Sequence, residues 1–366
     1  MGFSRMGAVV PVVLALVVGP QVGTARAFDI GVHREITTAA LAQIRACVVK
    51  HPGRWRSLEA IDAKEAALVG CDLKQDDVLR KFALWHFYSP DVHIEGSFWE
   101  ANWLNGDTSL DRFFSRLTDR LESAQDPDTV VGTAGAMLHY VQDVAVPAHV
   151  VPIFHPIFGV PRVIYGDKVD GAAFTPATPG EDEATCARLL DGEGGAPSPF
   201  PTILNQTAAA TLAAVKQAIP PAMITMEGDP QLLPRVERSW ALFWDLRRHE
   251  DGFADYGCGG NVFGEETFKC RFSLFKSVKI EVRPEAYRAF VEARHRAAVE
   301  ASVRVIAAAA ARPALAGAGQ RTSPGIVCPV AVSRRGGGVA LCEEPAAGAG
   351  ERVCPPDDRQ ASNRSP

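Results

Sequence analysis

Several signatures of common protein classes are absent from this sequence. After the N-terminal region, no apolar run is long enough to span a bilayer, which argues against a membrane-embedded protein. No Cys-x2-Cys pair is present, so a zinc site built from cysteines is not expected. There is no Gly-x-Ser-x-Gly elbow and no glycine-rich phosphate-binding loop, which argues against a serine hydrolase and a nucleotide-binding loop. The lack of an internal repeat excludes a repeat architecture.

The sequence also lacks a strong charge of either sign. Its 38 Lys and Arg residues and 43 Asp and Glu residues give a formal net charge of -5. This weak negative balance provides no electrostatic footprint for long nucleic acid, and no stable nucleic-acid complex is expected. A nuclease is not excluded, because bound zinc ions would supply positive charge where a phosphate group sits. With 366 residues, 47% of them hydrophobic, the chain can form one large core or two smaller ones.

The N-terminus has the pattern of a signal peptide. Arg5 precedes the apolar run Ala8 to Gly19, and the small residues Ala25 and Ala27 follow it. A charged start, a short apolar stretch and a small-x-small cleavage site are typical of export signals. We therefore expect residues 1–27 to be removed, Phe28 to become the first residue, and the mature protein to be secreted or periplasmic.

Eight cysteines, an even number, predict disulfide bonds in an exported protein. Cys258 and Cys270 flank a glycine-rich turn and are a plausible pair. The remaining pairing stays open, with Cys47 and Cys71 as one candidate pair and Cys186 paired with one of three tail cysteines as another: Cys328, Cys342 or Cys354.

The most informative motif contains His139, Asp143 and His149. His139 and Asp143 are four residues apart, which on a helix puts both side chains on one face. Pro147 then ends the helix, so that His149 can turn back toward the same point. Two imidazoles and one carboxylate that converge are typical of a divalent metal site, and this mixture of nitrogen and oxygen suits zinc. The alternative is a histidine at a helix end that hydrogen-bonds a carboxylate.

The expected new N-terminus adds two further candidate ligands. A free α-amine on Phe28 would bind a metal once it is deprotonated, together with the first carbonyl group. His33 follows five residues later and is close enough to complete such a set. The alternative is that His33 belongs to the first turn of the next helix.

A third candidate segment surrounds His86. Large apolar residues flank this histidine, and a cluster of carboxylates lies about ten residues upstream. The cluster contains Asp72, Asp76 and Asp77. His86 is either a structural histidine of the core or a further metal ligand, and the two other motifs favour the ligand.

Together these motifs resemble the superfamily of zinc-dependent phospholipases C and single-strand-specific zinc nucleases. The run His-x3-Asp-x5-His, with Pro147 two residues before its last histidine, matches the family motif, and His86 to Asp91 resembles the histidine segment of the phospholipase branch. Phe28 and His33 resemble the processed N-terminus, with a spacing closer to the nuclease branch. The resemblance covers residues 28–170. It implies a helical fold and a cluster of three zinc ions.

The resemblance also implies which residues hold each ion. Asp143 would bridge two zinc ions, one on the side of His139 and one on the side of the new N-terminus. Asp76 would orient or deprotonate the attacking water, although Asp72 and Asp77 are also within reach. The implied sets are Asp76, His86, His139 and Asp143 for the first zinc, Phe28, His33 and Asp143 for the second, and His149 for the third.

The third zinc site departs from the family pattern. The family usually supplies a His-x3-Glu or His-x3-Asp pair after the last motif histidine, and His155 has no carboxylate in its next turn. Asp167 and Asp170, three residues apart, are the nearest candidates to replace that pair, with or without His155. The alternative is that both are ordinary loop acids and that the third site is empty.

The apolar periodicity predicts a mostly helical protein. Together with the resemblance, it implies an all-α protein, a multi-helix zinc-dependent phospholipase C-like fold with long loop insertions. The helical hydrolase domain would cover residues 28–312, and a Gly/Ala/Pro-rich tail would cover 313–366. A loop-rich insert is expected at 154–201, and residues 252–282 have room for a short hairpin. The small residues between Gly132 and Ala136 allow a close helix neighbour. The expected helices cover 33–50, 61–69, 109–121, 129–144, 208–218, 233–248 and 284–311.

The predicted activity is phosphodiester hydrolysis by a zinc-bound hydroxide, with two or three zinc ions. A phospholipid head group is the preferred substrate, which implies transient contact with a membrane surface, and we expect a monomer. Phe98, Trp99 and Trp103 either line a lipid-facing mouth or belong to the core. The alternatives are a single-strand nuclease on the same fold and a non-catalytic exported zinc-binding protein with an incomplete third site.

Overall fold

The structure is a computed structural model. It describes residues 30–50, 56–76, 86–90, 110–151, 153, 167–175, 180, 182–191, 197–246, 256–316, 325–333, 339–346 and 352–354. The signal peptide predicted at 1–27, Phe28 and the aromatic residues Phe98, Trp99 and Trp103 lie outside these ranges.

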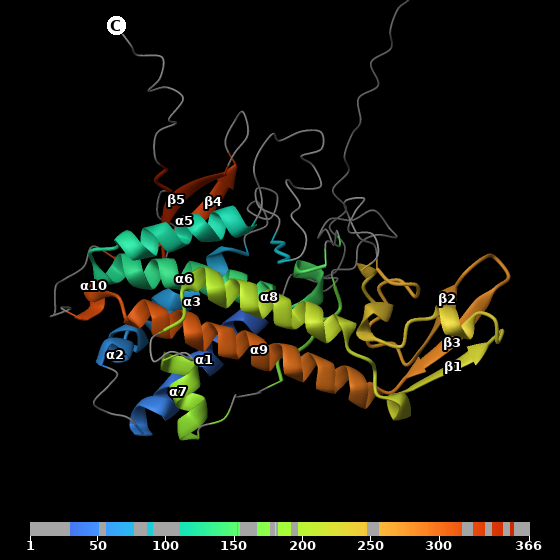
Figure 1. Ribbon diagram of the computed structural model, residues 1–366. Helices are drawn as coiled ribbons and strands as arrows, with labels where there is room; N and C mark the ends of the chain where they lie inside the picture. The colour runs from blue at the N-terminus through green and yellow to red at the C-terminus, as the bar shows by residue number, and fades with distance from the viewer. Residues whose placement is uncertain are drawn as a thin grey trace, which may run out of the picture.

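A helical body forms most of the described structure (Figure 1). The long helix α9 runs along this body, and α1, α6 and α8 pack against it. The body contains α1 (Ile30–Lys50), α2 (Arg56–Asp62), α3 (Glu65–Lys74), α5 (Leu110–Ser123), α6 (Pro127–Asp143), α7 (Glu183–Asp191), α8 (Phe200–Lys216), α9 (Pro284–Ala310) and α10 (Pro313–Ala316), with short 3-10 turns at Pro147–His149, Pro221–Met223, Leu233–Arg235 and Trp240–Leu242.

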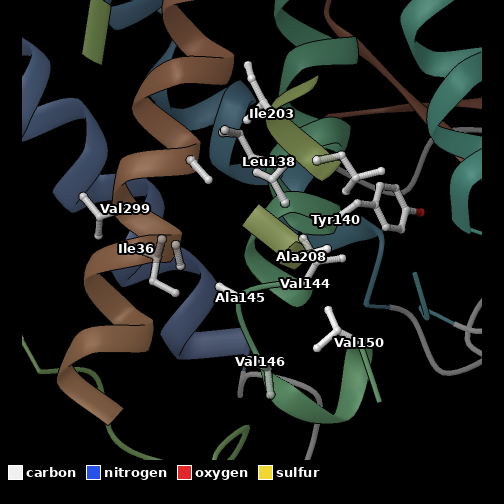
Figure 2. Packing of buried hydrophobic residues seen from close by; sticks show 14 of the residues in the cluster. Ile36, Leu138, Tyr140, Val144, Ala145, Val146, Val150, Ile203, Ala208 and Val299 are labelled. Carbon is white, nitrogen blue, oxygen red and sulfur yellow. The ribbon is translucent and has the colours of Figure 1, made fainter. Parts of the chain in front are cut away.

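Helix α6 lies at the centre of the core, and nearly all of its residues are buried. Figure 2 shows side chains such as Ile36, Leu138 and Val299 converging from α1, α6 and α9. The helix begins at Pro127, two residues before the predicted start, where Asp126 caps it by accepting a hydrogen bond from the Thr129 amide at 2.8 Å. Pro at the first helical position adds to this start. Burial of both faces explains why α6 can hold polar residues in a fixed position.

Two glycines allow α6 to approach its neighbours closely. A Cβ atom at Gly135 would lie 2.5 Å from the carbonyl oxygen of Leu68 and 2.7 Å from Cβ of Cys71, both on α3. A Cβ at Gly132 would overlap the carbonyl oxygen of Val327. The predicted close neighbour of this small-residue stretch is therefore confirmed, and it brings the carboxylates of α3 near α6.

The prediction of an all-α fold is wrong, because the described chain also contains two small antiparallel sheets. One sheet has three strands in the order β1-β3-β2, and the other pairs β4 with β5. The fold is mixed α and β, with the helices dominant. The strands are β1 (Ile224–Gly228), β2 (Thr267–Arg271), β3 (Ser277–Val282), β4 (Val327–Ser333) and β5 (Val339–Pro345).

The β2–β3 hairpin follows from strict alternation of apolar and polar residues. Phe268 and Cys270 on β2 face inward with Val278 and Ile280 on β3, while the residues between them are exposed. The hairpin expected within residues 252–282 is thus confirmed. The third strand of this sheet, β1, pairs with β3 through residues such as Met226 and Ile280. A search for helical periodicity does not detect such short strands. These short strands explain the error in fold class.

The expected C-terminal tail contributes the second sheet. Cys328 on β4 forms a disulfide with Cys71 on α3, and the Gln75 side chain donates a hydrogen bond to the carbonyl oxygen of Pro329 at 2.9 Å. Val330 and Cys342 are also buried there. The strands of the tail therefore cover α3 and α6 on one side.

One predicted helix and one predicted loop segment are wrong. The segment predicted as one helix at 233–248 forms two 3-10 turns where it is described, and Trp244 pairs with Tyr256 in an isolated bridge. Trp240 and Trp244 pack among Phe263 and Phe290, and this aromatic cluster determines the local path of the backbone. The insert expected to consist of loops contains α7, which packs against α9.

The four disulfides agree with an oxidising compartment. The pair Cys258–Cys270 is confirmed. The pairing of Cys47 with Cys71 is wrong, and so is the pairing of Cys186 with a tail cysteine, because α1 packs beside α7 whereas α3 packs beside β4. No helix in the described ranges is both long and apolar enough to cross a bilayer. The bonds are Cys47–Cys186, Cys71–Cys328, Cys258–Cys270 and Cys342–Cys354.

Candidate metal centre

His139 and Asp143 lie one turn apart on α6, as their spacing predicts. The distance from His139 Nε2 to Asp143 Oδ2 is 3.3 Å, and both side chains are fully buried. A carboxylate in such a place needs compensating positive charge, because burial of an isolated charge is very costly. Within the described residues, Asp143 forms ion pairs with three histidines, which are His33, His86 and His139.

His86 joins this pair from the extended segment 86–90. Its Nδ1 atom lies 2.8 Å from Asp143 Oδ2 and 3.2 Å from His139 Nε2. With the 3.3 Å distance between His139 and Asp143, the three atoms form a nearly equilateral triangle. Two ligand atoms that each lie about 2.0 Å from a tetrahedral zinc are separated by about 3.3 Å. The triangle therefore has the size of one face of a zinc coordination shell.

His33, on α1, approaches the other oxygen of the same carboxylate. His33 Nε2 lies 3.4 Å from Asp143 Oδ1, and the rings of His33 and His139 are stacked with centroids 4.2 Å apart. Ligand atoms of His33, His139 and Asp143 all lie within 4.8 Å of one another. The structure thus brings His33, His86, His139 and Asp143 together, and Asp143 presents one oxygen to each side, as a bridging carboxylate does.

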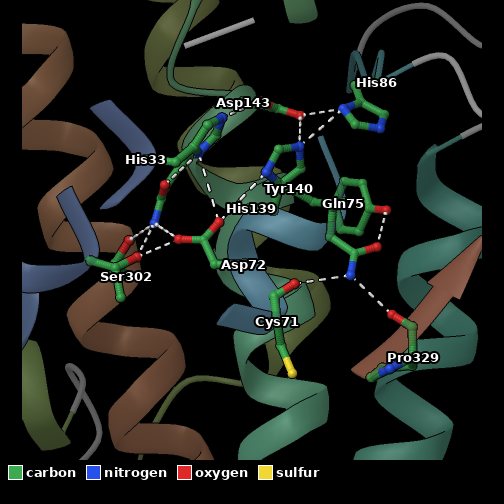
Figure 3. A network of polar contacts seen from close by, with 12 residues as sticks. His33, Cys71, Asp72, Gln75, His86, His139, Tyr140, Asp143, Ser302 and Pro329 are labelled. Carbon is green, nitrogen blue, oxygen red and sulfur yellow. Dashed lines mark hydrogen bonds and ion pairs between the residues drawn. The ribbon is translucent and has the colours of Figure 1, made fainter. Parts of the chain in front are cut away.

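A glutamine fixes the orientation of the His33 ring. His33 Nδ1 lies 2.6 Å from Gln142 Oε1, which can only accept, so Nδ1 carries the proton. The amide nitrogen of Gln142 donates to Thr37 Oγ1 at 2.8 Å and to Ser302 Oγ at 3.2 Å. Figure 3 shows this network, which joins α1, α6 and α9.

Asp72, on α3, completes the network behind the histidines. Its Oδ2 atom accepts a hydrogen bond from Thr37 Oγ1 at 2.5 Å, and its Oδ1 atom lies 3.5 Å from His139 Nδ1 and 3.8 Å from His33 Nδ1. A carboxylate or amide that holds the Nδ1 side of a histidine directs Nε2 toward the metal in many metalloproteins. Here both His33 and His139 direct Nε2 toward Asp143 in this way.

The ionisation of these groups follows from their contacts. Burial alone lowers the pKa of His33, but the hydrogen bond to Asp143 and the charge of Asp72 raise it to about 9. Burial raises the pKa of Asp72 to about 7. Burial also acts to raise the pKa of Asp143, yet the charges of the surrounding histidines hold it well below its usual value. The His33 ring therefore favours a cation at Nε2, and a divalent metal can replace a proton on an imidazole ligand.

Asp76, expected as a ligand and as the catalytic carboxylate, follows Asp72 just beyond α3. It is buried, and its charge is one of those that raise the pKa of His33. Asp72, which the sequence offered as an alternative, lies beside both His33 and His139. Asp77, the third candidate of the group, lies outside the described residues.

His149 and Asp170 form a neighbouring pair, with His149 Nε2 at 3.4 Å from Asp170 Oδ2. The Nδ1 atom of His149 donates to the backbone carbonyl of His86, which links this pair to the triangle. Asp167 is turned elsewhere, because its two oxygens accept hydrogen bonds from Trp244 Nε1 at 2.7 Å and from the Val169 amide at 2.9 Å. His155, the other candidate for this site, lies outside the described ranges.

Nearby carboxylates raise the pKa of His149, as they do that of His33. Burial lowers the pKa of His149, but the charges of Asp143 and Asp170 raise it to about 9. Burial together with the charge of Asp170 raises the pKa of Asp167 to about 7. Burial and these two carboxylates also raise the pKa of the Tyr256 phenol.

Several residues of the site were not found from the sequence. Gln142 directly precedes Asp143 in the motif, so its place beside the histidines follows from the helix once a metal centre is assumed. Thr37 lies one turn after His33 and is detectable in the same way. Ser302 and Trp244 come from distant segments and carry no local signal of their role.

No protein family model, no curated protein and no solved structure matches this chain.

Proposed function

We propose that this protein is an exported zinc-dependent phosphodiesterase of the phospholipase C type. The observation that carries the proposal is the buried triangle of His86 Nδ1, His139 Nε2 and Asp143 Oδ2, with sides of 2.8, 3.2 and 3.3 Å. Without a metal, His33 would have to carry a proton on both ring nitrogens, because Nδ1 donates to Gln142 while Nε2 faces Asp143. The donor set of nitrogen and oxygen, and the size of the triangle, both fit zinc.

Two adjoining centres favour phosphodiester chemistry over simple metal storage. Asp143 faces His86 and His139 with one oxygen and His33 with the other, and the pair formed by His149 and Asp170 lies next to them. Clusters of several metals are common in enzymes that cleave phosphate esters. Zinc bound at these residues would supply the Lewis acidity that polarises a phosphoryl oxygen and acidifies a water molecule.

The remaining side chains have separate tasks in this proposal. Gln142 and Asp72 hold the imidazoles by Nδ1, so that Nε2 stays available. Asp76 is buried near the histidines, and in the proposal its carboxylate accepts a proton from the attacking water. We propose the head group of a phospholipid as substrate, because the net charge of -5 provides no footprint for a long nucleic acid.

Purified mature protein reconstituted with zinc tests this proposal. We expect at least two zinc ions per chain and hydrolysis of a phosphorylcholine ester. His139→Ala should bind less zinc and lose the hydrolysis. His295→Asn is the matched control, because His295 is fully buried but belongs to α9 and accepts a hydrogen bond from Thr175 at 3.1 Å outside the cluster. A zinc-loaded protein that cleaves neither substrate, the ester nor single-stranded DNA, would contradict an enzyme. Cleavage of the DNA alone would assign a nuclease instead.

A further inference from the structure

The turn of the β2–β3 hairpin exposes two large apolar side chains. Leu274 and Phe275 are each 92% exposed. Among the described residues, the other large apolar side chains of this kind are Val49 and Val353, which are far apart in the sequence. Exposure of two adjacent large apolar side chains to water is unfavourable, and such exposed groups are typical of a binding surface. Figure 1 shows the hairpin extending past the end of α9, away from the helical body.

The hairpin holds this tip firmly. The amide of Phe272 donates to the carbonyl oxygen of Lys276 at 2.9 Å and closes the turn. The disulfide between Cys258 and Cys270 ties β2 to the preceding loop. The guanidinium of Arg235 lies 5.0 Å from the centre of the Phe272 ring. The apolar tip is therefore presented in a fixed conformation rather than folded back on the protein.

The exposed face of the same hairpin is basic. The hairpin strands and their turn, residues 267–282, contain four cationic side chains and one acidic one, Glu281, although the whole chain has a net charge of -5. Lys269 and Lys279 are direct cross-strand partners, an arrangement of like charges that destabilises a sheet. Glu227 on β1 lies 3.8 Å from Lys279 and offsets part of this repulsion. The exposed cations of the hairpin are Lys269, Arg271, Lys276 and Lys279.

We propose that the β2–β3 hairpin docks the protein on an anionic phospholipid bilayer. Leu274 and Phe275 would enter the boundary of the acyl chains, and the flanking cations would contact the phosphates of the head groups. A second copy of this chain is a poorer occupant, because it would bring two basic faces together over two apolar residues, far less area than a stable dimer buries. This inference stands independently of the proposed metal chemistry.

Sedimentation with vesicles tests the apolar tip. We expect the mature protein, without residues 1–27, to bind phosphatidylglycerol vesicles more tightly than phosphatidylcholine vesicles. The double variant Leu274→Ser, Phe275→Ser should bind both kinds at least about tenfold more weakly, since each side chain loses its transfer from water. Val49→Ser is the matched control, because Val49 is 79% exposed on α1, and it should bind as the original protein does.

The double variant Lys269→Gln, Lys279→Gln tests the basic face separately in the same sedimentation experiment. Each lysine near an anionic surface should contribute about fivefold, so binding to phosphatidylglycerol should fall while binding to phosphatidylcholine stays unchanged. Added salt should weaken the original protein more than this variant.

Three results would overturn the proposal. The first is that the original protein does not sediment with phosphatidylglycerol vesicles. The second is that the tip variant sediments as well as the original protein. The third is a dimer in light scattering that the tip variant dissociates, which would assign the tip to self-association. Because the readout is vesicle binding, its failure is distinct from a failure of zinc binding or hydrolysis.

Discussion

The centre around Asp143 and the neighbouring pair of His149 and Asp170 use the same residue types but are held differently. At Asp143 the ligands come mainly from helices, and the Nδ1 side of His33 is fixed by the side chain of Gln142. His149 lies in a 3-10 turn, and its Nδ1 atom is fixed by the backbone carbonyl of His86. Asp170 lies in a turn at residues 168–171 and not on a helix. We infer that the first centre binds metal more tightly than the second.

The largest expected effect is that of Asp143→Asn. The change removes the carboxylate that faces His33 on one side and His86 and His139 on the other. Loss of one anionic bridge weakens two ions at once, and their mutual repulsion is then less compensated. We expect Asp143→Asn to retain less zinc than His86→Ala, as measured by atomic emission on dialysed protein. Full retention of zinc in Asp143→Asn would show that Asp143 is not a bridge.

The next effect distinguishes the two centres. The double change Asp167→Asn, Asp170→Asn should lower the bound zinc by one ion and abolish hydrolysis, while the helical circular dichroism stays unchanged. The single change Asp170→Asn should be sufficient, because Asp170 faces His149 whereas Asp167 is held by Trp244. If the double variant keeps both its zinc content and its activity, the two acids are ordinary loop residues.

The third prediction compares buried histidines with and without a carboxylate beside them. Burial lowers the pKa of His295 to about 4, in contrast to His33 and His149. Because this folded-state pKa is below the unfolded value of about 6.5, the stability contribution is present above pH 6.5 and is lost as the pH falls toward 4. The loss should approach about 3 kcal/mol by the linkage relation.

Urea unfolding at a series of pH values, with His295→Asn as the reference, measures that difference. The variant can still accept from the Thr175 amide but does not titrate. We expect its stability to fall less steeply than that of the original protein between pH 6.5 and 4. Parallel curves would show that His295 titrates normally.

The smallest effect is expected at Gln142, which contacts His33 on the side away from Asp143. Gln142→Leu should weaken zinc binding by about tenfold to a hundredfold, the usual range for groups that orient a metal ligand. Gln142→Glu should restore much of it, because a carboxylate also accepts from Nδ1. Competition with a zinc-binding dye measures both. Equal affinities for Gln142→Leu and the original protein would assign Gln142 a purely structural role.

The sequence revealed the helix that carries the site more readily than the rest of the fold. The spacing of His139 and Asp143 and the small residues near Gly135 are local signals, and the structure confirms both. The strands were missed because each spans a few residues and depends on partners distant in sequence, such as Met226 and Ile280.

The same contrast holds for the site. The nearness of His33 and His86 to Asp143 was inferred from combined motifs, whereas the place of Asp72 beside His33 and His139 depends on how α3 packs against α6. The pairing of Cys186 with Cys47 depends on α7, which no local pattern predicted.

The most direct test of the metal centre is an anomalous diffraction map from crystals grown with zinc and measured at the zinc absorption edge. We predict a peak bounded by His86 Nδ1, His139 Nε2 and Asp143 Oδ2, at about 2.0 to 2.2 Å from each, and a second peak between His33 Nε2 and Asp143 Oδ1. A map without density at the triangle, in crystals of protein that is folded and active, would contradict the proposed zinc centre.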